Sequence, residues 1–299
     1  MIPSVSVIVA TYRRDESLKN ALKSLAQQDT RDFEIVLVDD NGVAEWNERV
    51  SAIVSAFQEE HSDVTMQYIV NAPNQGSAKT RNIGIAAARG EYVTFLDDDD
   101  IYLSNKVSRQ LDFMKSGGYD YSITDLLLYN ENDKLIDKRI RNYIESTEGE
   151  SLRRYHLMYH MTGTDTMMYT RAYLNKIGGF SPIDVGDEFY LMQRAIEGGG
   201  KFGYLPGCDL KAYVHTGENA GVSSGEGKIK GENQLYEYKK TFFDKVDARS
   251  RRYIRMRHYA VLAFAELRMK KILPALGDCF MSFLSAPIEC IKLFLGRKL

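Results

Sequence analysis

The chain has 299 residues, of which 44% are hydrophobic and 27% charged. This is the composition of a folded protein with room for one large domain and an appendage. The N-terminal residues lack the basic stretch, apolar stretch and cleavage site of a secretory signal. The three cysteines are odd in number and lack metal-type spacing, which indicates a reducing cytoplasm.

The net charge of −2 conceals an asymmetry along the chain. Residues 228–299 contain 16 Lys and Arg against 7 Asp and Glu, whereas residues 1–227 contain 23 against 34. An acidic body with a basic tail indicates a metal site in the first part and an anionic surface partner for the second.

Strands and helices alternate in the first half of the chain. Runs of β-branched and aromatic residues predict strands over 5–10, 33–38, 66–70 and 92–96. Apolar residues at helical spacing predict helices over 17–27, 46–57, 79–89 and 104–115. Such alternation predicts an α/β fold with a mostly parallel central sheet flanked by helices.

The second half is less regular. It predicts extended segments over 119–135, a polar loop over 141–153, a strand over 166–170, a helix over 189–197 and a strand over 211–215. Glycine and serine over 217–231 predict a mobile loop, and the pattern from 233 onward is helical. We therefore expect a catalytic domain over residues 1–230 and a basic, amphipathic helical extension over residues 231–299.

Four consecutive aspartates, Asp97 to Asp100, end the strand predicted over 92–96. Four carboxylates at one strand end repel one another unless a cation lies among them, and Mg²⁺ or Mn²⁺ prefers such oxygen ligands. Ligands of open α/β sheets also collect at the carboxyl ends of strands. A solvated acidic loop without a ligand is the alternative.

Two other segments are predicted to reach the same edge of the sheet. Asp39 and Asp40 end the second strand, where they could accept hydrogen bonds from a ligand. Asn74 to Gly76 form a turn before the helix that contains Arg81. Glycine there permits close backbone approach, and arginine can face phosphate.

With these residues in place, the chain resembles a family 2 glycosyltransferase with the A-type, nucleotide-diphospho-sugar fold. The segments that carry the resemblance are VSVIVATYRR, FEIVLVDD, NQGSAKTRNIGIAAARGEYVTFLDDDD and GGF…GDEFYLMQR. They span about residues 4–225, roughly three-quarters of the chain. The resemblance implies sugar transfer from a nucleotide diphosphate, with UDP as the expected nucleotide and Mn²⁺ or Mg²⁺ as the cofactor.

The resemblance also implies roles for individual residues. The nucleotide-sugar site would consist of Thr11, Tyr12, Arg13, Asp39, Asn74, Gly76, Arg81, Asp97 and Asp98. Among these, Asp39 would bind the base. The metal ligands would be Asp99, Asp97 and His215, although a histidine at a strand end is often structural. Asp100 lies beyond the family's DxD motif and could serve only as a helix-start residue.

Inverting members need a carboxylate base at the start of a helix that follows a GGF segment. Here Asp187 and Glu188 compete for that role. Register with the family's Glu-Asp motif favours Glu188, and residue type favours Asp187. Asp165 is a further candidate for contact with the acceptor.

The function expected is a metal-dependent, inverting hexosyl- or N-acetylhexosaminyltransferase that acts on a surface polysaccharide or lipid-linked glycan. Charges and prolines in the C-terminal region argue against a membrane-spanning helix. Its basic helices instead suit peripheral contact with the inner face of the cell membrane, with a helical cap or an oligomer contact as alternatives. We expect a cytoplasmic location and no nucleic-acid partner, and the oligomeric state stays open.

Two other functions are alternatives to a glycosyltransferase. A sugar-1-phosphate nucleotidyltransferase would carry a glycine-rich basic loop after its first strand, and residues 10–14 contain no glycine. A non-catalytic nucleotide-binding partner of another transferase would not need Asp99 or the Asp187–Glu188 pair.

Overall fold

The computed structural model describes residues 2–183, 186–215 and 225–296, which pack as two compact units. The first unit comprises residues 2–147, 161–183 and 187–215. The described residues of the second are 148–160, 186 and 225–296.

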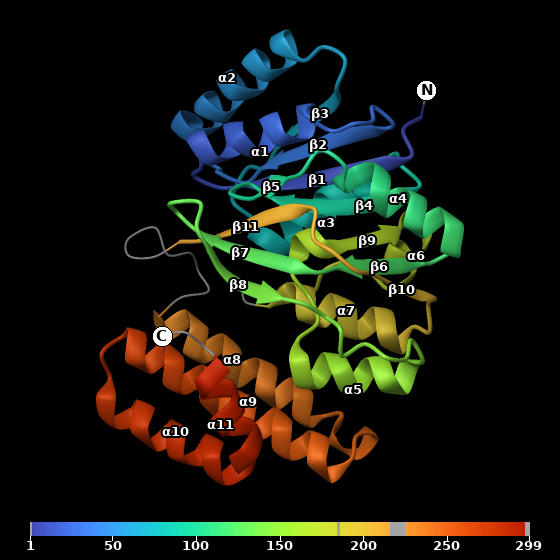
Figure 1. Ribbon diagram of the computed structural model, residues 1–299. Coiled ribbons are helices and arrows are strands. Elements are labelled where there is room, and N and C mark those ends of the chain that lie inside the picture. Colours follow the sequence, from blue (N-terminus) through green and yellow to red (C-terminus); the bar gives the residue numbers. More distant parts are fainter. Residues whose placement is uncertain (1, 184–185, 216–224, 297–299) are drawn as a thin grey trace. The chain divides into compact units, whose positions relative to one another are not determined.

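The core of the first unit is a seven-stranded sheet with the order β10-β6-β9-β4-β1-β2-β3 (Figure 1). Its strands are β1 (Val5–Thr11), β2 (Phe33–Asp39), β3 (Thr65–Val70), β4 (Tyr92–Asp97), β6 (Tyr121–Thr124), β9 (Met167–Thr170) and β10 (Phe202–Leu205). All neighbouring strands are parallel except at β9, which runs antiparallel to both β4 and β6. The prediction of an α/β fold with a mostly parallel sheet is confirmed.

Burial explains why these sequences form strands. Every residue of β2 is buried, as are six of the seven in β1. Central parallel strands are covered on both faces and therefore read as continuous apolar runs. Helices flank this sheet, and they are α1 (Glu16–Ala26), α2 (Ala44–Glu60), α3 (Ser77–Ala87), α4 (Lys106–Gly117), α6 (Arg171–Lys176) and α7 (Asp187–Glu197).

A second, four-stranded sheet has the order β5-β11-β7-β8. Its strands are β5 (Ile101–Tyr102), β11 (Leu210–Val214), β7 (Leu126–Asn130) and β8 (Leu135–Arg139). Strand β5 directly follows the four aspartates and pairs with β11, which leads into His215. This small sheet therefore brings His215 towards the aspartates, although more than a hundred residues separate them.

The second unit is helical. It contains α5 (Gly149–Tyr159), α8 (Gly225–Lys240), η3 (Phe243–Lys245), α9 (Ala248–Arg268), α10 (Ile272–Ser285) and α11 (Pro287–Gly296). The Asp247 side chain caps α9 by accepting a hydrogen bond from the Ser250 amide. A small core of Met256, Ala286 and Cys290 packs α9 against the start of α11.

Three sequence-based expectations were wrong in part. The loop predicted over 141–153 ends early, because helix α5 begins at Gly149. The loop predicted over 217–231 is helical from Gly225, where α8 begins, and 217–224 lie outside the described residues. Strand β10 was not predicted, since its four residues are too few for an alternating pattern to show.

Candidate active site

Three neighbouring strands end level with one another at the carboxyl edge of the main sheet. Thr11 of β1 is in register with Asp39 of β2, and Ala10 is in register with Asp97 of β4. Parallel pairing therefore places the two predicted acidic segments at the same edge, where open α/β sheets bind ligands.

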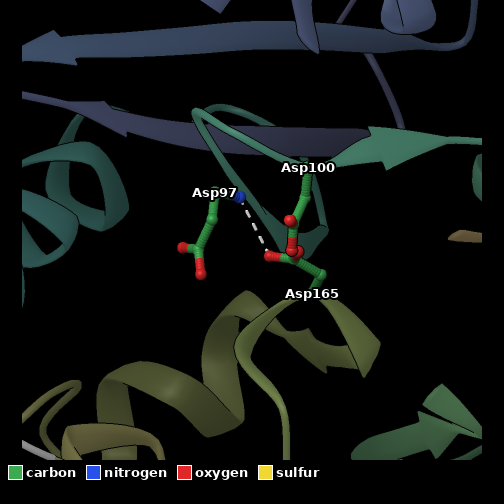
Figure 2. Close-up of side chains that lie close together, drawn as sticks. All are labelled: Asp97, Asp100 and Asp165. Carbon is green, nitrogen blue, oxygen red and sulfur yellow. Dashed lines mark hydrogen bonds between the residues drawn. The ribbon is translucent and has the colours of Figure 1, made fainter. Parts of the chain in front are cut away.

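Asp97, Asp100 and Asp165 form a carboxylate cluster at this edge (Figure 2). One carboxylate oxygen from each of the three lies within 4.8 Å of the others. The Asp97 amide donates to Asp165 Oδ1 at 2.9 Å, and the Tyr213 amide donates to Asp100 Oδ1 at 2.8 Å. Burial, followed by the charge of Asp97, raises the pKa of Asp165 to about 7.

This cluster corrects one expectation. Asp100 is not a helix-start residue, because α4 begins only at Lys106, and the residue is 6% exposed. Asp165 is 3% exposed and lies in η1 (Thr164–Thr166), where its carboxylate is directed at Asp97 and Asp100. Its contact with an acceptor stays a prediction.

Asp98 and Asp99 have different partners. The Tyr12 amide donates to Asp98 Oδ2 at 3.2 Å, and burial raises the pKa of Asp98 to about 7. The Arg14 guanidinium donates to Asp99 Oδ2 at 2.9 Å. His215 Nε2 lies 3.1 Å from that same oxygen, so the predicted pair of Asp99 and His215 is in contact.

The donor set fits a divalent cation. His215 Nε2 is buried and, among the described residues, has no hydrogen-bond partner, despite its distance of 3.1 Å from Asp99. A buried ring nitrogen at this distance from a carboxylate oxygen is placed to share a cation with it. Carboxylate oxygens suit Mg²⁺ and Mn²⁺, and an imidazole is also accepted by Mn²⁺.

Arg81 joins this acidic edge to the predicted catalytic pair. Its Nη2 donates to Asp97 Oδ1 at 2.7 Å, and its Nη1 donates to Asp187 Oδ2 at 2.8 Å. The guanidinium side chain is only 11% exposed. Arg81 was predicted to face phosphate, but in this structure both of its terminal nitrogens hold carboxylates.

Asp187 and Glu188 lie in the first turn of α7. Asp187 is 6% exposed, and burial, opposed by Arg81, raises its pKa to about 7. Glu188 is only half-buried, and its amide donates to Asp187 Oδ1 at 2.9 Å. The two acids thus differ in surroundings: Asp187 is held by Arg81, whereas Glu188 is the more exposed residue.

Asp39 is completely buried at the end of β2. It accepts hydrogen bonds from the amide and side chain of Asn41, from Asn47 Nδ2 at 2.9 Å and from the Tyr68 hydroxyl at 2.8 Å. Both of its oxygens are therefore engaged by the protein in this structure.

Asp40, which was predicted with Asp39 to accept hydrogen bonds from a ligand, accepts them from the 74–76 loop in this structure. Its carboxylate accepts from the amides of Gln75 at 2.7 Å and Gly76 at 2.9 Å. Its carbonyl accepts from Asn74 Nδ2 at 2.6 Å. Asn74 and Gly76 are thereby fixed next to the end of β2, as the sequence indicated.

The end of β1 completes this edge. Thr11 is buried and its carbonyl accepts a hydrogen bond from the Asp40 amide. Tyr12 is 46% exposed, and Arg13 has a left-handed φ of 53° while its amide donates to Asn41 Oδ1 at 2.7 Å. The structure therefore gathers all predicted nucleotide-site residues at one edge of the first unit.

Sequence reasoning missed two partners of the predicted residues: Arg14, which pairs with Asp99, and Asp165 as a neighbour of Asp97. Arg14 adjoins predicted residues, so its position along the chain was a usable signal. Asp165 comes close only through the pairing of β9 with β4, and no local pattern reveals that pairing.

A mostly parallel sheet with an aspartate cluster at the end of β4 defines an A-type, nucleotide-diphospho-sugar transferase fold. Solved structures agree. TarS of S. aureus in complex with UDP matches with a TM-score of 0.64 and 20% identity, covering 96% of this chain and 82% of that one. A mannosyltransferase of Pyrobaculum calidifontis in complex with GDP-Man and Mn²⁺ matches with a TM-score of 0.63 and 16% identity, covering 99% and 79%.

The chain belongs to glycosyl transferase family 2, whose model matches residues 6–178. It is a glycosyltransferase. An uncharacterised glycosyltransferase of Methanocaldococcus jannaschii is 26% identical over 219 residues, 73% of each chain. A GalNAc(5)-diNAcBac-PP-undecaprenol β-1,3-glucosyltransferase of Campylobacter jejuni is 35% identical over 133 residues, which cover 44% of this chain and 41% of that enzyme. Other relatives are much longer, and the match spans 21% of one from Rickettsia conorii.

Proposed function

We propose that the chain is a metal-dependent, inverting glycosyltransferase that uses a UDP-sugar. It transfers a hexosyl or N-acetylhexosaminyl group to a surface polysaccharide or lipid-linked glycan. One observation carries the proposal: Arg81 contacts both Asp97 of the metal-capable edge and Asp187 of the acidic pair. The proposed metal site and the proposed catalytic base would therefore lie close together, joined through Arg81, within residues 1–230, the proposed catalytic domain.

The relatives support the donor class. TarS was solved with UDP and with UDP-GlcNAc, and the Pyrobaculum mannosyltransferase with GDP-Man and Mn²⁺. In this chain the donor would lie along the edge formed by Thr11, Asp39 and the Asn74–Gly76 loop. Opening of the Asp39 hydrogen bonds to Asn47 or Tyr68 would free an acceptor for the base.

Asp97, Asp99 and His215 would hold Mn²⁺ or Mg²⁺, with the oxygens of Asp100 and Asp165 beside Asp97. The bound ion would supply positive charge for the diphosphate leaving group. Arg14, which pairs with Asp99 at 2.9 Å, adds a second positive charge at the same edge.

Glu188 is the proposed general base. The bond from the anomeric carbon to the β-phosphate oxygen breaks, and the diphosphate leaves with the electron pair. The acceptor oxygen bonds to the opposite face of that carbon while its proton passes to the Glu188 carboxylate. Asp187 positions Glu188 by accepting its amide hydrogen bond at 2.9 Å and is itself held by Arg81.

We place the enzyme in the cytoplasm, peripheral to the inner face of the cell membrane. The free cysteines and the basic character of residues 231–299, the proposed extension, support this location. The Campylobacter relative is named for an undecaprenol-linked acceptor, which supports a lipid-linked glycan here. None of the described helices is long and apolar enough to cross a membrane.

The experiment is a donor panel with purified protein and Mn²⁺, in which nucleoside diphosphate release and the anomeric configuration of any product are measured. Glu188→Gln should reduce transfer by ~10²- to 10⁴-fold while donor affinity stays within a factor of about two, as expected for a group that acts only on the acceptor. A product with retained configuration would exclude inversion. Pyrophosphate release from a nucleoside triphosphate and a sugar phosphate would instead identify a nucleotidyltransferase.

A further inference from the structure

Helix α10 exposes an apolar surface that the catalytic chemistry does not use. Its inner side packs on α9 through the buried residues Ala275 and Ser282, and the Ser282 hydroxyl donates to the Met256 carbonyl at 2.9 Å. The opposite side is exposed and apolar, with Leu273 at 82%, Leu276 at 59%, Phe280 at 61%, Phe283 at 43% and Leu284 at 57%. Asp278 is the single charged residue in the helix.

Helix α11 also exposes apolar residues. Ala286 and Cys290 are buried against Met256, whereas Ile288 and Ile291 are 65% and 49% exposed. The spacing of 288 and 291 places both on one side of the helix. We refer to the exposed apolar residues of α10 and α11 as the outer face.

The outer face is unlike a protein-binding surface. Protein interfaces carry about one hydrogen bond per 100–200 Å², and the exposed residues named above have no side-chain donor or acceptor. The acyl region of a bilayer requires none. Large exposed apolar patches mark interaction sites rather than ordinary surface, so the chemistry of this patch favours lipid.

Basic residues border the outer face. Arg268, Lys270 and Lys271 are exposed immediately before α10, and Lys292 is exposed in α11. Lys271 forms an ion pair with Glu226, and no ion pair is found for the other three among the described residues. A rim of cations around an apolar surface complements anionic phospholipid headgroups.

The length of α10 fixes how it could meet a bilayer. Its 14 residues extend ~21 Å, less than the ~30 Å thickness of the hydrocarbon layer. The helix is therefore suited to lie parallel to the membrane plane with one side immersed.

We propose that the outer face of α10 and α11 inserts into the acyl boundary of an anionic phospholipid bilayer, with Arg268, Lys270 and Lys292 at the headgroups. This names the surface by which the proposed enzyme reaches its membrane. It depends on the helical unit and not on the transfer reaction, so either can fail without the other.

The test is flotation of the full chain with vesicles of phosphatidylcholine alone or mixed with phosphatidylglycerol. The wild type should float with the mixed vesicles and bind those of phosphatidylcholine alone at least ~tenfold more weakly. Leu276→Glu and Phe280→Glu should each lower partitioning by ~tenfold or more. The matched control is Ile136→Glu in β8, which changes a 51% exposed side chain of the first unit and should leave partitioning unchanged.

Thermal unfolding of each variant verifies that it folds, since the altered side chains are exposed. Donor hydrolysis without vesicles should match the wild type for both α10 variants. Wild-type protein that stays unbound with the mixed vesicles overturns the proposal. A wild-type dimer that Phe280→Glu converts to a monomer without lipid also overturns it, because the outer face would then bind a second copy.

Discussion

Removal of the Arg81 guanidinium should destabilise the first unit strongly. Its two hydrogen bonds, at 2.7 Å to Asp97 and 2.8 Å to Asp187, are both charge-assisted, and the Arg81 and Asp187 side chains are 11% and 8% exposed. Loss of one member of a buried ionic group costs ~3–5 kcal/mol, because the remaining charges stay buried and uncompensated. Arg81→Met should therefore lower the free energy of unfolding by about that amount at pH 8 without metal.

Arg81→Lys provides the intermediate case. An ammonium keeps the charge but cannot hold two carboxylates in the fixed fork of a guanidinium. Because one charge-assisted hydrogen bond is lost, Arg81→Lys should lower the free energy of unfolding by ~1.5–3 kcal/mol. Arg139→Met is the matched control, since Arg139 pairs with Asp137 at 3.4 Å on the surface and is 52% exposed, and it should cost less than ~1 kcal/mol.

The assay is urea unfolding of the metal-free protein at pH 8 and pH 5. Asp187 already has a pKa raised to about 7 by burial, in spite of Arg81. At pH 5, below this pKa, Asp187 is mostly neutral in the wild type and in the variant. Arg81→Met then leaves one fewer uncompensated charge than at pH 8, so its penalty should shrink there. Equal stability of Arg81→Met and Arg139→Met at pH 8 would refute the reasoning.

Three other predictions concern single residues of the first unit. Burial raises the pKa of Asp165, which lies in the carboxylate cluster with Asp97, to about 7, so Mn²⁺ should displace protons and bind more tightly as pH rises from 6 to 8, measured by calorimetry in buffers of different ionisation enthalpy. Burial acts to raise the pKa of Glu34, but hydrogen bonds from Arg89, Ser6 and Gln67 together lower it by more, so the pKa of Glu34 is below its ordinary value. The stability it contributes is present above its unfolded pKa and lost as pH falls, so Glu34→Gln should flatten the acid side of the unfolding profile between about pH 5 and pH 3. Gly42→Ala should weaken nucleotide binding and stability, because φ is 67° and a Cβ would lie 2.6 Å from the Asn74 amide.

Each of these has a contrary outcome. Identical binding enthalpies in all buffers would mean that no proton leaves with Mn²⁺ binding. If the stability of wild type and of Glu34→Gln falls in parallel as pH is lowered, Glu34 has the same pKa in the folded and the unfolded protein. Gly118→Ala is the control for Gly42→Ala, since Gly118 has a φ of 57° and open space around it. If the two alanine variants behave alike, steric contact with Asn74 is irrelevant.

Much of the sheet could be predicted because its signal is local. Strands β1, β2 and β4 are buried on both faces, so their β-branched runs mark them directly. The start of helix α5 was missed because residues 149–153 are mostly polar and the apolar side of the helix is completed by α9. The start of α8 was missed because Gly225, Gly227 and Gly231 favour loops, and tertiary packing overrides that weak preference.

The candidate site, like the fold, could be predicted from the sequence only in part. Asp39 and Asp97 could be placed together because parallel strands end at one edge. The contacts that organise the site join residues far apart: Arg81 to Asp187 spans 106 positions, and Asp97 to Asp165 spans 68. Neither follows from spacing, because each depends on how α7 and η1 pack against the sheet.

The central claim is tested most directly by Mn²⁺-dependent hydrolysis of a UDP-sugar in the absence of acceptor. The account predicts slow release of UDP by the wild type, loss of that release with a chelator, and at least a ~100-fold decrease in Asp99→Asn, with Asp137→Asn unchanged as a surface control. Failure of the wild type to bind or hydrolyse any nucleotide sugar, or an Asp99→Asn variant as active as the wild type, would contradict it.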